Sequence, residues 1–213
     1  MDTKEKEQKG TTIPNPHDIF AKEMLSYKQN AIDFFGGILP KKLQANLDLQ
    51  TVGADKTSYS DEKLKEYFSD VVYICSSRSG ETTVKLALLF EHKSALSDFP
   101  FGQLLRYISL IWDLHDKQKE PIPIVLPILF YHGKGQWKQR PLYTYLAGDT
   151  VLYDRFIPEF EYLLINLREY PDEFILKTFG HNPGVKLWLF IQKYIFTPDK
   201  VLEQLENLTE SDK

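Results

Sequence analysis

The chain has 213 residues, of which 42% are hydrophobic and 14% aromatic, and its 26 basic and 30 acidic residues give a formal net charge of -4. This composition is typical of a packed globular protein, and it excludes a collagen-like chain, a disordered chain and a bulk polycation. A charged N-terminus and the lack of an apolar run of about 18 residues argue against a signal peptide and a spanning helix. With the single Cys75, which cannot form an internal disulfide, they predict a cytoplasmic protein without membrane contact.

The N-terminal part of the chain predicts a flexible leader, a helix and a strand. Residues 1–16 are mostly charged and polar and offer no apolar face to bury. Apolar residues then recur at steps of three and four from Asp18, a candidate N-cap, which predicts a helix that Gly36 and Gly37 end. Over 45–52, leucines alternate with polar residues, which is the period of a half-buried strand.

The middle of the chain predicts a β-hairpin, a helix and a strand. Segments 69–75 and 84–90 are rich in β-branched and aromatic residues and flank a turn-like cluster, which predicts the hairpin. Helical spacing follows over 101–115, with Pro100 at the expected start. The apolar run 122–131 predicts a strand covered on both faces, although Pro123 and Pro127 favour a bulged or partly edge position.

Beyond residue 150 the pattern is helical. Apolar residues at helical spacing over 156–170 and 184–196 predict two helices, and 199–208 predicts a short last one. We therefore expect a leader at 1–16, a core at 17–150 and a helical extension at 151–213 that packs on the core.

Three charged residues lie at the ends of the predicted hairpin strands. Glu91 and Lys93 are two residues apart and project to one side of their strand, and antiparallel pairing brings Asp70 toward Glu91. Two carboxylates at such a place can share Mg²⁺, and a neighbouring lysine can act on a water that attacks a phosphate. From spacing alone, the alternative is a set of surface ion pairs.

Two further sets of residues can contact a nucleic acid. Gln103 and Arg106 share a helix face with Tyr107, for which a solvated helix face is the alternative. The Gly-punctuated loop 132–140 carries three basic residues around Trp137, a mix that suits phosphate contacts and base stacking. A solubilising turn with Trp137 folded into the core fits this loop equally well. Asp18 and Lys22 lie four apart and are either a rim of the site or a cap and a surface pair.

In their order along the chain, these residues resemble the PD-(D/E)XK nuclease superfamily. Within it they are most similar to the bacterial family of recombination-promoting nucleases and "putative transposases". The likeness covers roughly residues 17–150. It rests on HDIFAKEML at 17–25, IDFFGGILP at 32–40, SDVVY at 69–73, LLFEHKS at 88–94, FGQLLRYISLIWD at 101–113 and PIVLPILFYHGKGQW at 123–137.

The resemblance implies an α/β fold with a restriction-endonuclease-like αβββαβ core, and metal-dependent cleavage of DNA. It implies that Asp70 and Glu91 bind Mg²⁺, which Mn²⁺ can replace, with the backbone carbonyl of His92 as a further ligand. Lys93 is then the lysine of the E-x-K element, and Gln103 points into the active site. Many relatives carry Gln at the position of Lys93, and Ser69 replaces the leading Pro of the superfamily motif.

DNA is the expected partner, and a role in recombination or transposition follows from the family alone. The residues expected to contact DNA are Arg106, Lys134, Trp137, Lys138 and Arg140. A homodimer is a reasonable expectation because a double-strand cut needs two sites. The competing hypothesis is a catalytically silent DNA-binding or regulatory interaction module that retains the nuclease fold.

Overall fold

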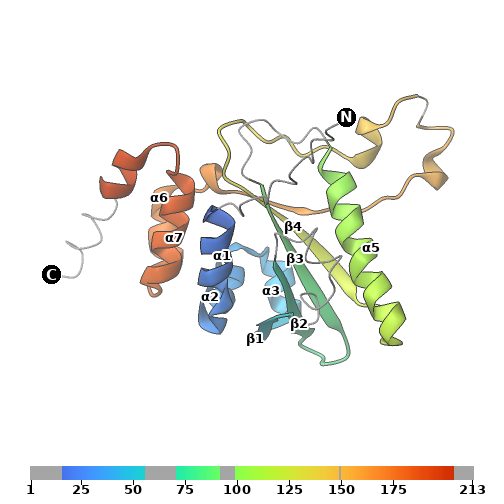
Figure 1. The fold of residues 1–213 in the computed structure, drawn as a ribbon, viewed down its shortest axis with the longest axis horizontal. Helices are drawn as coiled ribbons and strands as arrows, with labels where there is room; N and C mark the ends of the chain where they lie inside the picture. The colour runs from blue at the N-terminus through green and yellow to red at the C-terminus, as the bar shows by residue number, and fades with distance from the viewer. Residues whose placement is uncertain (1–15, 56–70, 92–98, 149, 204–213) are drawn as a thin grey trace, which may run out of the picture.

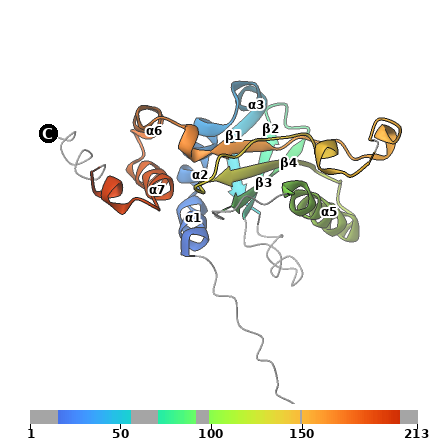
Figure 2. The same ribbon diagram turned by 90° about the horizontal axis from the view of Figure 1, so that it is seen from above.

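A mixed five-stranded sheet with helices on both faces forms the centre of the molecule (Figures 1 and 2). The computed structural model describes residues 16–55, 71–91, 99–148 and 150–203. The helices are α1 (Pro16–Ser26), α2 (Lys28–Ile38), α3 (Lys41–Asn46), α5 (Pro100–Gln118), α6 (Asp172–Phe179) and α7 (Pro183–Lys193). The strands are β1 (Leu47–Ala54), β2 (Val71–Ser77), β3 (Thr83–Glu91), β4 (Ile124–Tyr131) and β5 (Leu163–Asn166). Short 3-10 turns lie at η2 (Leu142–Tyr145), η3 (Asp154–Phe156) and η4 (Leu167–Glu169).

The strands follow one another across the sheet in their order along the chain. β1, β2 and β3 pair antiparallel, whereas β3, β4 and β5 pair parallel. The predicted hairpin of β2 and β3 is confirmed, with Val71 opposite Leu88 and Ser76 opposite Thr83. Helix α5 makes the crossover from β3 to the parallel strand β4.

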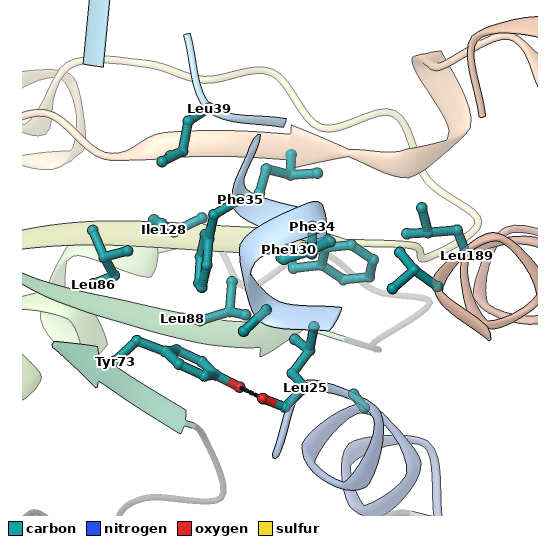
Figure 3. Packing of buried hydrophobic residues seen from close by; sticks show 14 of the residues in the cluster. Leu25, Phe34, Phe35, Leu39, Tyr73, Leu86, Leu88, Ile128, Phe130 and Leu189 are labelled. Carbon is teal, nitrogen blue, oxygen red and sulfur yellow. Dashed lines mark hydrogen bonds between the residues drawn. The ribbon is translucent and has the colours of Figure 1, made fainter. Parts of the chain in front are cut away.

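The larger apolar core lies between the sheet and the helices α1, α2, α6 and α7. Phe34 of α2 packs edge-on against Trp188 of α7, and Trp188 in turn stacks on Phe130 of β4. Tyr73 of β2 is fully buried and donates a hydrogen bond from its hydroxyl to the carbonyl of Leu25 at 3.1 Å (Figure 3). This core therefore joins residues from both ends of the described chain.

Helix α5 covers the opposite face of the sheet over a second core. Phe101, Leu104 and Ile111 of α5 pack here with Leu129 of β4. The predicted helix is confirmed, since α5 buries this stripe, begins at Pro100 and ends at Gln118, and the C-cap residue Lys119 has a left-handed φ of 58°.

The N-terminal helical segment differs from the prediction in two ways. Tyr27 has extended backbone angles and divides the segment into α1 and α2, and α1 begins at Pro16, so Asp18 lies inside the helix and is not its N-cap. Gly36 and Gly37 do not end α2, which continues to Ile38. Gly37 lies so close to α6 that an added Cβ atom would meet the Phe179 ring at 2.3 Å.

The prediction of a strand over 122–131 is confirmed by β4. Residues 124–131 pair with β3, but only 128–131 pair with β5. Pro127 thus lies in the part of β4 that pairs with β3 alone, one residue before the pairing with β5 begins. Its missing N–H therefore removes no hydrogen bond to β5.

A helix over 156–170 is wrong. The structure has β5 there, between two 3-10 turns. Leu163 and Ile165 pack on the larger core, whereas Tyr162 and Leu164 pack on the core beneath α5, so burial alternates with the period of a strand. The helix predicted over 184–196 is present as α7, and 198–203 are helical.

The sheet and the larger core both continue past residue 150, through β5 and α7. The division into a core and an extension at that residue stays a prediction. None of the helices in the described residues is both long enough and apolar enough to span a bilayer.

Candidate functional site

The candidate site begins at the last residue of β3. Glu91 ends this strand and pairs in register with Tyr131 at the end of β4. Asp70, His92 and Lys93 lie outside the described residues. The structure thus gives the strand that carries Glu91, together with the surroundings of its two faces.

The alternation predicted for β3 is present. Leu86 and Leu88 pack in the larger core, whereas Ala87 packs in the core beneath α5. Lys85 belongs to the α5 side of the strand, where only 3% of the residue is exposed. The face of β3 that α5 covers therefore carries a charged side chain in its buried part.

Lys85 forms an ion pair that the sequence analysis missed. Its ammonium lies 2.5 Å from a carboxylate oxygen of Asp55, and both side chains are at least 96% buried. Asp55 directly follows β1, and its backbone N–H donates to the carbonyl of Val72 at 2.8 Å. The signal in the sequence is a lysine in the middle of an apolar strand, since such a charge needs a buried partner.

The helix face predicted to point at the site borders a cavity. Gln103, Arg106, Tyr107 and Leu110 line a volume of about 240 Å³ on one flank of α5. Gln103 and Arg106 are exposed, whereas Tyr107 is buried. The first turn of α5 and the end of β3 both lie toward the upper end of the molecule in Figure 1. The structure thus brings the predicted α5 residues together around one hollow.

The loop 132–140 does not present its tryptophan to solvent. Trp137 is 6% exposed, and its indole N–H donates to the hydroxyl of Tyr162 at 3.1 Å. Its ring packs against Tyr131 with centroids 5.1 Å apart. Trp137 is therefore a core residue, and the expectation that it stacks on a DNA base is corrected, because a ring so deeply buried has no free face.

The basic residues of this loop are exposed and held in place. The Arg140 guanidinium lies 4.3 Å from the centroid of the Tyr145 ring, and the Lys134 ammonium lies 4.7 Å from that of Phe196. Lys138 is exposed between them in sequence. The loop backbone is fixed by Arg168, whose guanidinium donates to the carbonyl of Lys134 at 3.0 Å. The loop thus has a fixed backbone and exposes three cations, Lys134, Lys138 and Arg140, and we call it the platform of loop 132–140.

The described residues contain no group of three or more His, Cys, Asp or Glu side chains placed to hold a metal ion. Of the predicted ligands, the described residues include Glu91 alone, through the backbone of β3. The donor set that the sequence offers consists of carboxylate and carbonyl oxygens, which is the chemistry that Mg²⁺ prefers. The residues of the predicted site therefore fit the ion by donor type.

Comparison with known proteins shows the family of the chain. The family described as "Putative transposase, YhgA-like" matches residues 15–213, so the chain belongs to this family. No solved structure matches the chain.

Curated relatives of the chain include the following Escherichia coli proteins. "Recombination-promoting nuclease RpnD" of strain O157:H7 is 30% identical over 192 residues, which cover 86% of this chain and 69% of the relative. "Inactive recombination-promoting nuclease-like protein RpnE" of strain K12 is 28% identical and is covered over 62% of its length, with 90% of this chain aligned. "Recombination-promoting nuclease RpnA" of strain K12 is 31% identical over 119 residues, 55% of this chain and 40% of the relative. The chain thus spans only part of each of these relatives.

Proposed function

We propose that the protein is a metal-dependent DNA endonuclease whose site lies at the end of β3. The observation that carries the proposal is the antiparallel register of β2 and β3, in which Val71 stands opposite Leu88. Extended by one residue, this register would set Asp70 opposite Leu89, two residues before Glu91. Strand alternation would place Asp70 on the same face of β2 as Val72. It would likewise place Glu91 on the same face of β3 as Ala87, and this is the face beneath α5.

The element order supports this proposal. The helix α2, the strands β1, β2 and β3, the crossover helix α5 and the parallel strand β4 follow one another as the αβββαβ core expects. We infer that this is the restriction-endonuclease-like core, with β5, α6 and α7 added to it. The names of two relatives, the recombination-promoting nucleases RpnD and RpnA, support a nuclease role in recombination.

Each residue of the site has a defined chemical task in the proposal. Asp70, Glu91 and the carbonyl of His92 would hold Mg²⁺ or Mn²⁺, which supplies a more acidic bound water and offsets charge on the phosphate. Lys93 orients the attacking water or donates positive charge near the reacting phosphate. Gln103, which lines the hollow on α5, positions the scissile strand.

The proposed DNA path runs over the cations near this end of the molecule. Arg106 lines the hollow beside Gln103, and the platform of loop 132–140 presents Lys134, Lys138 and Arg140. Such contacts bind phosphates in any sequence, so they position DNA without reading it.

A second candidate is a catalytically silent module that binds DNA or regulates a partner. Two relatives are named inactive, one of which is aligned over 90% of this chain. A relative that is similar over most of this chain thus carries a name that calls it inactive.

Relaxation of supercoiled plasmid by the purified protein tests both candidates. We expect nicking with Mg²⁺ and with Mn²⁺, none with EDTA, and a loss of roughly 100-fold or more in Glu91→Gln and in Lys93→Ala. Glu81→Gln is the matched control, because Glu81 is an exposed glutamate in the turn between β2 and β3, at the other end of the hairpin. Nicking that persists in Glu91→Gln would refute the proposed site. Inert wild-type protein that still binds DNA would favour the silent module.

A further inference from the structure

An apolar arm projects from the molecule beside the first turn of α5. The arm is the segment 150–157, which extends beyond α5 at the right of Figure 1. It exposes 83% of Val151, 69% of Leu152, 56% of Tyr153 and 82% of Phe156. Four large apolar residues exposed to this extent within six positions form a patch of the kind that marks an interaction site.

The chain just before the arm is fixed to the N-terminal end of α5. Tyr145 of η2 packs against Phe99 and Phe101, with ring centroids 5.6 and 5.8 Å apart. Phe101 also packs edge-on against Phe160, which follows the arm. The arm is therefore anchored on both sides, and its exposed residues stand on a fixed base.

A second exposed apolar patch lies toward the C-terminal end of the same helix. It consists of Trp112 on α5 with Ile122 and Ile124 at the start of β4, exposed by 45%, 53% and 60%. The indole N–H of Trp112 donates to the carbonyl of Pro123 at 3.0 Å, which joins the helix to this segment. In Figure 1 the start of β4 lies beside the lower end of α5, so arm and patch occupy opposite ends of one edge.

The helix flank between the two patches is open. Leu105, Ser109 and Trp112 follow one another at steps of four and three, so they share this flank of α5. Phe101 and Trp112 are about 16 Å apart along the helix axis, from a rise of 1.5 Å per residue. Gln103, Arg106 and Leu110 form a different flank, so a partner on the first flank leaves the proposed nuclease site accessible.

We propose that a second copy of this chain docks on this edge, with the two α5 helices antiparallel about a two-fold axis. The arm of each copy covers the patch of Trp112, Ile122 and Ile124 on the other. A two-fold rotation places the arm of each copy on the patch of the other, so the same contact forms twice. The arrangement is therefore isologous, and it closes at two copies. The nuclease proposal is not needed for this inference.

The exposed area agrees with what a stable dimer needs. With about 150–250 Å² for a fully exposed large side chain, scaled by the exposed fractions given above, the seven exposed apolar residues of arm and patch offer on the order of 800 Å² per copy, which is what one partner contributes to a standard interface. A nucleic acid fits the arm poorly, because residues 150–157 carry Asp154 against Arg155 and so offer no net positive charge to a phosphate backbone. The apolar, net-neutral character of the arm thus favours a protein surface.

Sedimentation velocity of the full chain over the micromolar range tests the proposal. We expect a dimer, and a dissociation constant raised at least tenfold in Leu152→Asp on the arm and equally in Trp112→Glu on the patch. The double variant Leu152→Asp with Trp112→Lys should regain part of the affinity, because each new carboxylate then faces a new ammonium. Leu202→Asp is the matched control, since Leu202 is 59% exposed and lies outside both patches. Monomeric wild type, or a dimer that neither single variant weakens, would overturn the proposal.

A disulfide test locates the axis. Ser109 is exposed on the flank between the patches, so Ser109→Cys should form a dimer linked across the axis under mild oxidation. Burial raises the pKa of the native Cys75 thiol, so this residue adds little background. Ser79→Cys, at an equally exposed turn, should stay unlinked. Linking at position 79 but not at position 109 would contradict the antiparallel arrangement of α5.

Discussion

The buried pair of Lys85 and Asp55 fixes where β1 ends relative to β3. Two charges removed from water gain less from each other than their desolvation costs, so such a pair adds little net stability. Its effect is on geometry, because the side chain of Asp55 reaches the α5 face of β3 while its backbone N–H bonds Val72 of β2. The pair therefore joins three neighbouring strands near the start of β2.

Removal of one partner of this pair should destabilise the fold more than removal of both. Asp55→Ala leaves the Lys85 ammonium buried without this carboxylate, and we expect a loss of about 3–5 kcal/mol in the free energy of unfolding. The double variant Asp55→Leu with Lys85→Met should lose clearly less, because no charge remains to be buried. Urea unfolding of the three proteins measures the difference. A double variant as unstable as Asp55→Ala would show that the charge itself is not the cause.

At the residue scale, the sequence predicted the alternation along β3 better than the long-range contacts around it. The alternation along β3 follows from a period of two, which needs no tertiary information, and the described part of β3 has it. The position of Trp137 was left open, because it depends on Tyr162, a partner 25 residues further along the chain. The pair of Lys85 and Asp55 is 30 residues apart and was missed for the same reason.

At the scale of elements, the two adjacent glycines of α2 differ in how closely their neighbours pack. A Cβ atom on Gly37 would lie 2.3 Å from the Phe179 ring and 2.9 Å from Thr178 of α6. Phe179 is 1% exposed and is held by the larger core, so it has no room to retreat. A Cβ atom on Gly36 would meet Leu49 at 3.7 Å, which is an ordinary contact. Gly37 alone allows α2 and α6 to approach so closely.

Alanine at these two positions should therefore change stability in opposite directions. We expect Gly37→Ala to lower the free energy of unfolding by about 1–3 kcal/mol through overpacking against Phe179. Gly36→Ala should raise it by up to about 1 kcal/mol, because alanine favours a helix over glycine. Parallel urea titrations of the two variants give the comparison, with each serving as the control of the other. Equal shifts in both would mean that the contact with Phe179 is relieved at little cost.

The sequence predicted α5, the β2–β3 hairpin and β4 correctly. The helix α5 shows a plain apolar stripe, and the β2–β3 hairpin has strands and turn residues in their expected places. The strand β5 was misread because apolar residues on both faces of a short strand mimic helical spacing. The break at Tyr27 was missed because apolar residues at helical spacing run through it.

At the scale of the whole molecule, the net charge of -4 restricts the DNA binding that we propose. An acidic chain needs a local concentration of cations, and the platform of loop 132–140 supplies one. Lys134 and Arg140 rest on aromatic rings, whereas Lys138 is exposed and belongs to no ring contact among the described residues.

Lys138→Ala should weaken DNA binding uniformly across sequences. If Lys138 neutralises one phosphate, the slope of the logarithm of affinity against the logarithm of salt concentration should become shallower by about 0.9. Fluorescence anisotropy with labelled duplexes in EDTA measures this without cleavage. Lys42→Ala, which removes an exposed lysine of α3, should leave the slope unchanged. An unchanged slope in Lys138→Ala would place the DNA path elsewhere.

The larger core joins α1 and α2 to α7, and this has a consequence for the order of events during synthesis. Asn182 donates to the side chain of Asn30 across 152 residues of sequence, and Val185, Trp188 and Leu189 complete the core around Phe34. Contacts of such long range form late and slow folding, since the intervening chain must first be made and closed. On a ribosome, the strands that carry the proposed site emerge well before the helix that covers the other face of their sheet. The strands of the proposed site would therefore have their larger core completed only once α7 has been synthesised.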